Sequence, residues 1–135
     1  MHNVAVRSND YLREARQWTT YPEDCVAHAI RIAERLLEEG RAPWIGRVRD
    51  VQGQWHGPLI PRRFEGVTWT THYVACAGRE VYDPIAGEPL DVDAYAVPVF
   101  GKPLIVETHV GVEETAQLLR AGTLQERFRV YRTAR

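Results

Sequence analysis

The sequence predicts an α+β domain in which helices pack on one antiparallel sheet. Helical periodicity marks one segment in the first third of the chain and another near its end, and short apolar segments separated by turn signals lie between them. The chain has 135 residues, of which 44% are hydrophobic and 26% charged, as in ordinary globular proteins with one core. We therefore expect a single domain over residues 1–135.

Two helices are expected in the N-terminal third of the chain. The first begins near Asn9 or Asp10, because either residue can cap it. The second has Pro22 in its first turn and ends at Gly40. The side chains expected to be buried by the first helix are Tyr11, Leu12, Ala15 and Trp18. The apolar stripe of the second helix consists of Val26, Ala29, Ile30, Ala33, Leu36 and Leu37.

Beyond Gly40 the pattern changes from helical to extended. Residues 43–51 are predicted to form a strand, and the Gly- and Pro-rich segment 52–66 a long loop. Strands at 67–77 and 80–83 flank Gly78-Arg79, and a Gly at the first central position favours a two-residue type II′ hairpin turn. The remaining expected elements are a strand at 103–108, a helix over 112–121 ended by Gly122, and a closing strand at 127–132.

Composition and charge exclude several classes of function. The net charge is -1 and no basic block is longer than Arg62-Arg63, which argues against binding nucleic acid through phosphate contacts. No apolar run approaches the length of a membrane span, and the N-terminus lacks the apolar stretch of a secretory signal. Two cysteines are too few for a disulfide framework. We expect a cytoplasmic protein, or one that a larger secreted system delivers into a target cell.

A Cys, a His and an Asp occupy the local positions that nucleophilic thiol chemistry requires. Cys25 lies at the start of the second helix, His72 lies in an apolar strand, and Asp83 ends the strand after it. A helix N-terminus and a nearby imidazolium favour the thiolate, which is the nucleophilic form of cysteine. The imidazole must in turn be oriented by a third group, commonly a carboxylate. The pattern predicts a catalytic triad of Cys25, His72 and Asp83.

The hairpin explains how His72 and Asp83 would meet. If Gly78-Arg79 form the turn, Val74 faces Asp83 on the neighbouring strand. Because side chains alternate along a strand, His72 shares a face with Val74 and Asp83. The two residues are then diagonal neighbours, with backbones roughly 7 Å apart, a gap that their side chains can bridge. We expect a helix packed over that same face to bring the Cys25 thiol to the other imidazole nitrogen.

The predicted reaction is attack of the Cys25 thiolate on a carbonyl carbon, with His72 moving protons and a thioacyl intermediate. The developing oxyanion would meet the backbone N–H of Cys25 and a side-chain donor from the preceding loop. The candidates for that donor are Gln17, Thr19 and Thr20. This chemistry requires no cofactor.

These residues resemble the papain-like fold, in which a Cys at the start of a central helix is followed by a His on one strand and an Asn or Asp on the next. The segments CVAHAIRIAERLLEEG, THYVACAGREVYDPIAGEPL and AYAVPVFGKP are most similar to the compact papain-fold domains of bacterial polymorphic toxins and effectors. The resemblance covers about residues 18–104. It implies hydrolysis or transfer at an amide of a protein substrate, either a peptide bond or a glutamine side chain, and a cognate immunity or inhibitor protein.

The resemblance has departures that bear on the reaction subtype. The oxyanion Gln of this family lies a few residues before the Cys, whereas the nearest Gln here is Gln17, eight residues upstream. No Gly-rich signature surrounds Cys25, which favours a small deamidase-like member over a papain-type endopeptidase. Transglutaminases and acyltransferases that share the triad order remain alternatives.

Other interpretations stay open at the level of sequence. The chain could keep a papain-like scaffold without catalysis and serve as a module that binds a partner protein. Asp91 or Asp93 could replace Asp83 as the residue that orients His72. A zinc site is a further alternative, disfavoured because no C-x2-C pair is present. Its mixed sulfur and nitrogen ligands would be Cys25, His28, His72 and Cys76.

Overall fold

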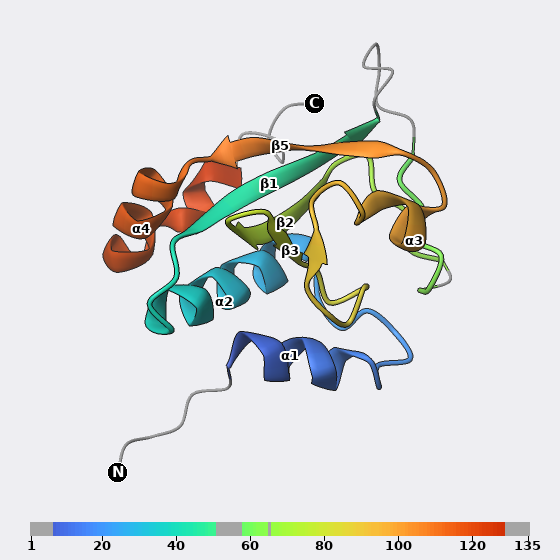
Figure 1. The fold of residues 1–135 in the computed structure, drawn as a ribbon, viewed down its shortest axis with the longest axis horizontal. Coiled ribbons are helices and arrows are strands. Elements are labelled where there is room, and N and C mark those ends of the chain that lie inside the picture. The colour runs from blue at the N-terminus through green and yellow to red at the C-terminus, as the bar shows by residue number, and fades with distance from the viewer. Residues whose placement is uncertain (1–6, 51–57, 65, 129–135) are drawn as a thin grey trace.

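The computed structural model describes residues 7–50, 58–64 and 66–128. In this part of the chain four α-helices and a 3₁₀ helix pack against a five-stranded antiparallel sheet of order β4-β3-β2-β1-β5 (Figure 1). The predicted α+β class is confirmed. In chain order the elements are α1 (Ser8–Ala15), α2 (Cys25–Glu38), β1 (Pro43–Asp50), β2 (His72–Ala77), β3 (Glu80–Tyr82), β4 (Leu90–Asp91), α3 (Ala96–Phe100), β5 (Leu104–Val110), α4 (Val112–Ala121) and the 3₁₀ helix η1 (Leu124–Phe128).

The second helix begins at Cys25 as predicted, but the residues expected to cap the first helix and to open the second do not have those roles. Neither Asn9 nor Asp10 caps α1, which begins at Ser8. The Ser8 backbone N–H and hydroxyl both donate to the Glu39 carboxylate, at 2.6 and 2.8 Å, so a residue just beyond α2 satisfies this helix start. Pro22 precedes α2 rather than lying in its first turn, because Asp24 is the N-cap.

Sequence periodicity predicted some of the later elements correctly and others only in part. The helix α4 has the predicted bounds, and Gly122 follows it in the left-handed conformation. The expected strand at 67–77 begins only at His72, and its first part contributes one isolated bridge, between Leu59 and Trp69. The closing strand expected at 127–132 is wrong for its first two residues, which end η1, and its other residues lie outside the described part of the chain.

The hairpin of β2 and β3 has the predicted turn and register. Of the two turn residues only Gly78 has a positive φ, of 56°, as a type II′ turn requires. Cys76 pairs with Val81, and Ala75 with Tyr82. The same register, continued by one position, places Asp83 beside Val74.

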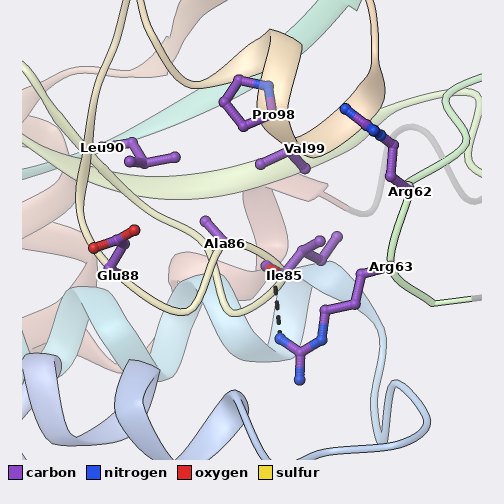
Figure 2. A pocket seen from close by; sticks show the side chains of 8 residues that line it. All are labelled: Arg62, Arg63, Ile85, Ala86, Glu88, Leu90, Pro98 and Val99. Atoms are coloured by element: carbon purple, nitrogen blue, oxygen red, sulfur yellow. Dashed lines mark hydrogen bonds between the residues drawn. The ribbon is translucent and has the colours of Figure 1, made fainter.

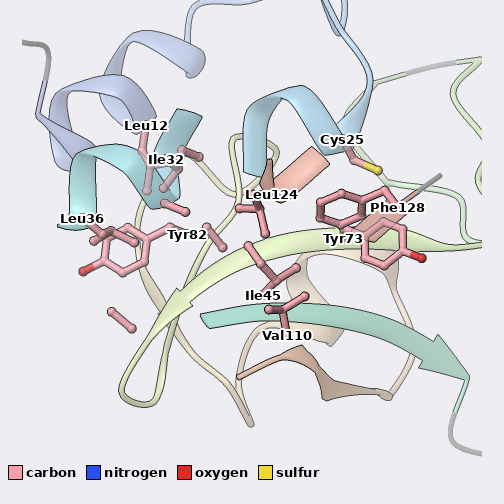
Figure 3. Close-up of a cluster of buried hydrophobic side chains, with 13 residues drawn as sticks. Leu12, Cys25, Ile32, Leu36, Ile45, Tyr73, Tyr82, Val110, Leu124 and Phe128 are labelled. Carbon is pink, nitrogen blue, oxygen red and sulfur yellow. The ribbon is translucent and has the colours of Figure 1, made fainter. Parts of the chain in front are cut away.

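Buried side chains form two clusters that alternate along β2, and α2 belongs to only one of them. The first cluster contains Tyr73 and Ala75 of β2 together with Ile32 and Leu36 of α2. Figure 3 shows Ile32 and Leu36 at one end of this cluster and Tyr73 at the other. The second cluster contains Val74 and Cys76 of β2, together with Tyr95, Val99 and Phe100. The expectation that the cysteine-bearing helix covers the face of His72 and Val74 is therefore wrong. It covers the opposite face, because its apolar stripe packs on Tyr73, Ala75 and Ala77.

Candidate active site

Cys25 is the first residue of α2. The Asp24 side chain accepts a hydrogen bond from the Ala27 backbone N–H at 3.0 Å and so caps the helix. The backbone amides of the first helical turn have no acceptor within the helix, and they create a partial positive charge there. Figure 3 shows Cys25 at the end of α2 that lies over Tyr73, the second residue of β2. The thiol therefore reaches the site from the helix end, and its residue is 6% exposed.

His72 and Asp83 are joined by a fully buried hydrogen bond. His72 Nε2 lies 2.9 Å from Asp83 Oδ2, and both residues have 0% of their surface exposed. The bond follows directly from the hairpin register, which puts both side chains on the same face of the sheet. The predicted pairing of these two residues is present in the structure.

Asp83 accepts two further hydrogen bonds. The Ile85 backbone N–H donates to Oδ1 at 3.0 Å, and the Tyr95 hydroxyl donates to Oδ2. Burial alone would raise the pKa of this carboxyl, but the charge of His72 and these hydrogen bonds hold it below its usual range. Asp83 is thus an ionised carboxylate with its position fixed from three sides.

The imidazole of His72 is enclosed by aromatic rings. The Trp69 ring stacks on it with centroids 4.1 Å apart, and Phe100 meets it edge-on at 5.7 Å. Burial disfavours the imidazolium, but the charge and hydrogen bond of Asp83 outweigh burial and raise the pKa of His72 to about 10. Cys25 is close enough to contribute to this increase, whereas His72 Nδ1 forms no hydrogen bond of regular geometry within the described residues. The thiol is thus near the ring, and Nδ1 remains available to it.

Tyr21 adds a buried hydroxyl beside these residues. Its ring meets Trp69 edge-on at 5.4 Å, and its hydroxyl oxygen is buried without a hydrogen-bond partner in the described chain. Burial raises the pKa of Tyr21, and the nearby charges of Asp83 and Cys25 raise it further. A buried hydroxyl without a partner is costly, which makes this one a candidate for a role in binding a substrate atom.

The other predicted site residues lie apart from this cluster. Gln17, Thr19 and Thr20 are exposed, and none of the hydrogen bonds seen in the described residues joins their side chains to Cys25. Asp91 and Asp93 form exposed ion pairs with Arg79 rather than with His72.

The residues of the zinc alternative are not gathered around one point. His28 is buried and its Nδ1 lies 2.7 Å from the Tyr11 hydroxyl. Cys25 and Cys76 are both free thiols. Across the described residues no group of three His, Cys, Asp or Glu side chains is arranged to hold a metal ion.

None of the helices in the described part of the chain has both the length and the apolar character that a membrane span requires.

Sequence reasoning missed three aromatic residues of the site. Tyr95 and Tyr21 lie in segments with no apolar period, and Trp69 lies in the segment predicted as a strand, where alternation would put it on the face opposite to His72. Only Trp69 carries a usable signal, because it lies three residues before His72 on the same chain segment. The partnership of Tyr95 with Asp83 depends on the path of the chain after β4, which local pattern does not specify.

Comparison of the chain with protein-family models, with curated proteins and with solved structures found no match. The interpretation of the site therefore rests on its own geometry.

Replacing Tyr95 with Phe should destabilise the fold. The change removes a donor from a buried carboxylate and leaves that acceptor incompletely satisfied, at a cost of about 1–3 kcal/mol in the free energy of unfolding. Urea unfolding at neutral pH measures the loss. Tyr82→Phe is the matched control, because the Tyr82 hydroxyl bonds the exposed side chains of Arg41 and Glu80, which can bind water instead, so its loss should cost less. Equal losses in the two variants would contradict the role given to Tyr95.

The pKa of His72 predicts that stability falls as the pH rises. The imidazole binds its proton more tightly in the folded chain, with a pKa of about 10, than in the unfolded chain, where the value is about 6.5. The stabilisation is therefore complete below the unfolded value and is lost as the pH rises towards the folded one, with a slope of at most about 1.4 kcal/mol per pH unit.

Urea unfolding of the wild type and of His72→Gln across this pH window measures the difference in slope. The wild type should lose stability more steeply than the variant, which has no imidazole at position 72. Parallel curves would show that His72 does not hold its proton in the folded state.

Proposed function

We propose that the chain is a cysteine-dependent hydrolase or deamidase that acts on an amide of a protein substrate. Cys25 is the nucleophile, His72 the acid and base, and Asp83 the residue that orients and charges the imidazole. The observation that carries the proposal is the buried hydrogen bond between His72 and Asp83, with the Cys25 thiol beside the same ring. The resemblance of the sequence segments to the papain-like fold adds to it, and so does the order of the three residues along the chain.

In the proposed reaction the Cys25 thiolate attacks the amide carbonyl carbon and forms a tetrahedral adduct. The His72 imidazolium then protonates the leaving nitrogen as the carbon–nitrogen bond breaks, which leaves a thioester and neutral imidazole. Neutral His72 takes a proton from water, the hydroxide attacks the thioester, and the carboxylic acid departs as the thiolate and the imidazolium re-form. A peptide bond gives two peptides in this scheme, and a glutamine side chain gives glutamate and ammonia.

The oxyanion of the adduct needs donors in addition to the Cys25 backbone N–H. Tyr21 supports this role better than the exposed Gln17, Thr19 or Thr20, because its buried hydroxyl has no acceptor among the described residues. Tyr21 also lies in the loop immediately before Cys25, the segment from which such a donor was expected. We therefore include Tyr21 in the proposed catalytic machinery.

The biological setting follows the resemblance. As a papain-like toxin or effector domain of bacteria, the chain would act in a target cell and be neutralised by a cognate inhibitor protein. Transglutaminase and acyltransferase chemistry share the same thioester and differ only in the acceptor. The low exposure of Cys25 favours a second candidate, a papain-like module that binds a partner protein without catalysis.

The activated thiol is tested by alkylation with iodoacetamide at about pH 6.5, where an ordinary cysteine is only about 1% thiolate. Cys25 should react much faster than Cys76, and replacing His72 with Ala or Gln should slow it by at least about tenfold. Cys76 is the internal control, because it is fully buried and burial raises its pKa. Its alkylation in a variant would report loss of the fold rather than loss of activation. A Cys25 that reacts equally in wild type and folded variants would favour the binding module.

The role of Tyr21 is tested by comparing two reactions of the same thiol. p-Nitrophenyl acetate acylates a thiolate through an oxyanion and releases p-nitrophenolate, whereas iodoacetamide alkylates it without one. Tyr21→Phe should slow the p-nitrophenolate burst by about 100-fold and leave alkylation unchanged. Tyr11→Phe is the matched control, because the Tyr11 hydroxyl is already paired with His28 and both reactions should proceed normally. An equal loss in both reactions, or a loss in neither, would remove Tyr21 from the mechanism.

A further inference from the structure

A pocket of about 480 Å³ is lined in part by the turn that follows Asp83. This volume is within the range of small-molecule sites. Figure 2 shows its apolar side chains gathered around the hollow, from the turn after β3, from β4 and from α3. These apolar lining residues are Ile85, Ala86, Leu90, Pro98 and Val99.

The charged residues at the edge of the pocket differ in their interactions. Arg63 donates to the carbonyl oxygens of Pro84 and Ile85 and so stabilises the turn. Figure 2 shows its bond to Ile85. Glu88 pairs with Arg16 at 3.6 Å. Arg62 is exposed, and its guanidinium has no hydrogen bond or ion pair in the part of the chain that the structure describes. One cation therefore remains available to a ligand.

The arrangement of these charges selects the kind of anion. Figure 2 shows Arg62 and Glu88 on opposite sides of the hollow, with the apolar residues between them. A carboxylate would be attracted to Arg62, which can bind it with two parallel hydrogen bonds. At the other end Glu88 offers only acceptor oxygens, so a second carboxylate would find no hydrogen-bond donor on it. The pocket thus matches a ligand with one carboxylate and an apolar body.

We propose that this pocket binds a monoanionic apolar carboxylate, with the carboxylate on Arg62 and the apolar body against Ile85 and Val99. The shared chemistry has two sources, a small organic acid and the C-terminus of a polypeptide with apolar last residues. The site is separate from the Cys25 thiol, so it does not depend on the proposed hydrolase activity. It does share a wall with the triad, because the Ile85 backbone N–H donates to Asp83.

The experiment titrates the full chain with octanoate and with octanamide, which differ only in the charged group, and follows binding by calorimetry and amide chemical shifts. Octanoate should bind saturably and at least about threefold more tightly than octanamide. Arg62→Gln should remove this preference. Ala86→Leu, which fills the hollow, should weaken both ligands. Arg120→Gln on α4 is the matched control and should behave as the wild type, because it removes the same charge away from the pocket.

A second pair of probes, N-acetyl-dileucine with a free or an amidated C-terminus, distinguishes the two sources. Tighter binding of the free-acid peptide than of octanoate assigns the pocket to a polypeptide C-terminus, and the reverse assigns it to a small acid. Equal affinity for acid and amide in both pairs, or no effect of Arg62→Gln, would overturn the proposal. So would the absence of saturable binding by any of the four probes. None of these measurements uses Cys25, so their outcome is independent of the alkylation result.

Discussion

The buried hydrogen bond between His72 and Asp83 is the interaction on which the rest of the site depends. A charged pair without solvent is stable only if its remaining polar atoms are satisfied, because desolvation of each ion costs several kcal/mol. Asp83 meets this condition through Tyr95 and the Ile85 backbone. Their positions are therefore constrained by the pair: α3 must begin where the Tyr95 hydroxyl reaches Oδ2, and the chain must turn directly after Asp83.

The three residues of the proposed triad come from both faces of the sheet at one end of β2. The helix α2 packs on the face opposite to Val74, so only its first residue comes near His72. The loop before Cys25 must then be held against the turn after Asp83. Arg63 joins the two, because it donates to carbonyl oxygens of Ala15 and Trp18 at the end of α1 and of Pro84 and Ile85 in the turn. The Arg63 side chain thus connects the loop before Cys25 to the turn after Asp83.

The sequence pattern correctly predicted the features that depend on turn geometry and on the alternation of side chains along a strand. The turn at Gly78 fixes the hairpin register, and that register alone predicts the contact of His72 with Asp83. The face covered by α2 was not predictable in this way, because β2 is apolar on both faces and its sequence does not say which one meets the helix. The strand predicted at 67–77 was cut short for a similar reason. Trp69, before His72, packs on the imidazole, and within the described residues it forms only an isolated bridge, with Leu59, which does not extend the ladder.

The charge state of His72 determines which of its roles comes first in the proposed mechanism. With a pKa of about 10, the imidazole carries its proton at neutral pH and cannot begin as a base. In the proposed mechanism the first proton that His72 transfers therefore goes to the leaving nitrogen. The energetic reason is the carboxylate of Asp83, which stabilises the imidazolium within an apolar enclosure of Trp69 and Phe100. Only after that proton has left does His72 become the base that activates water.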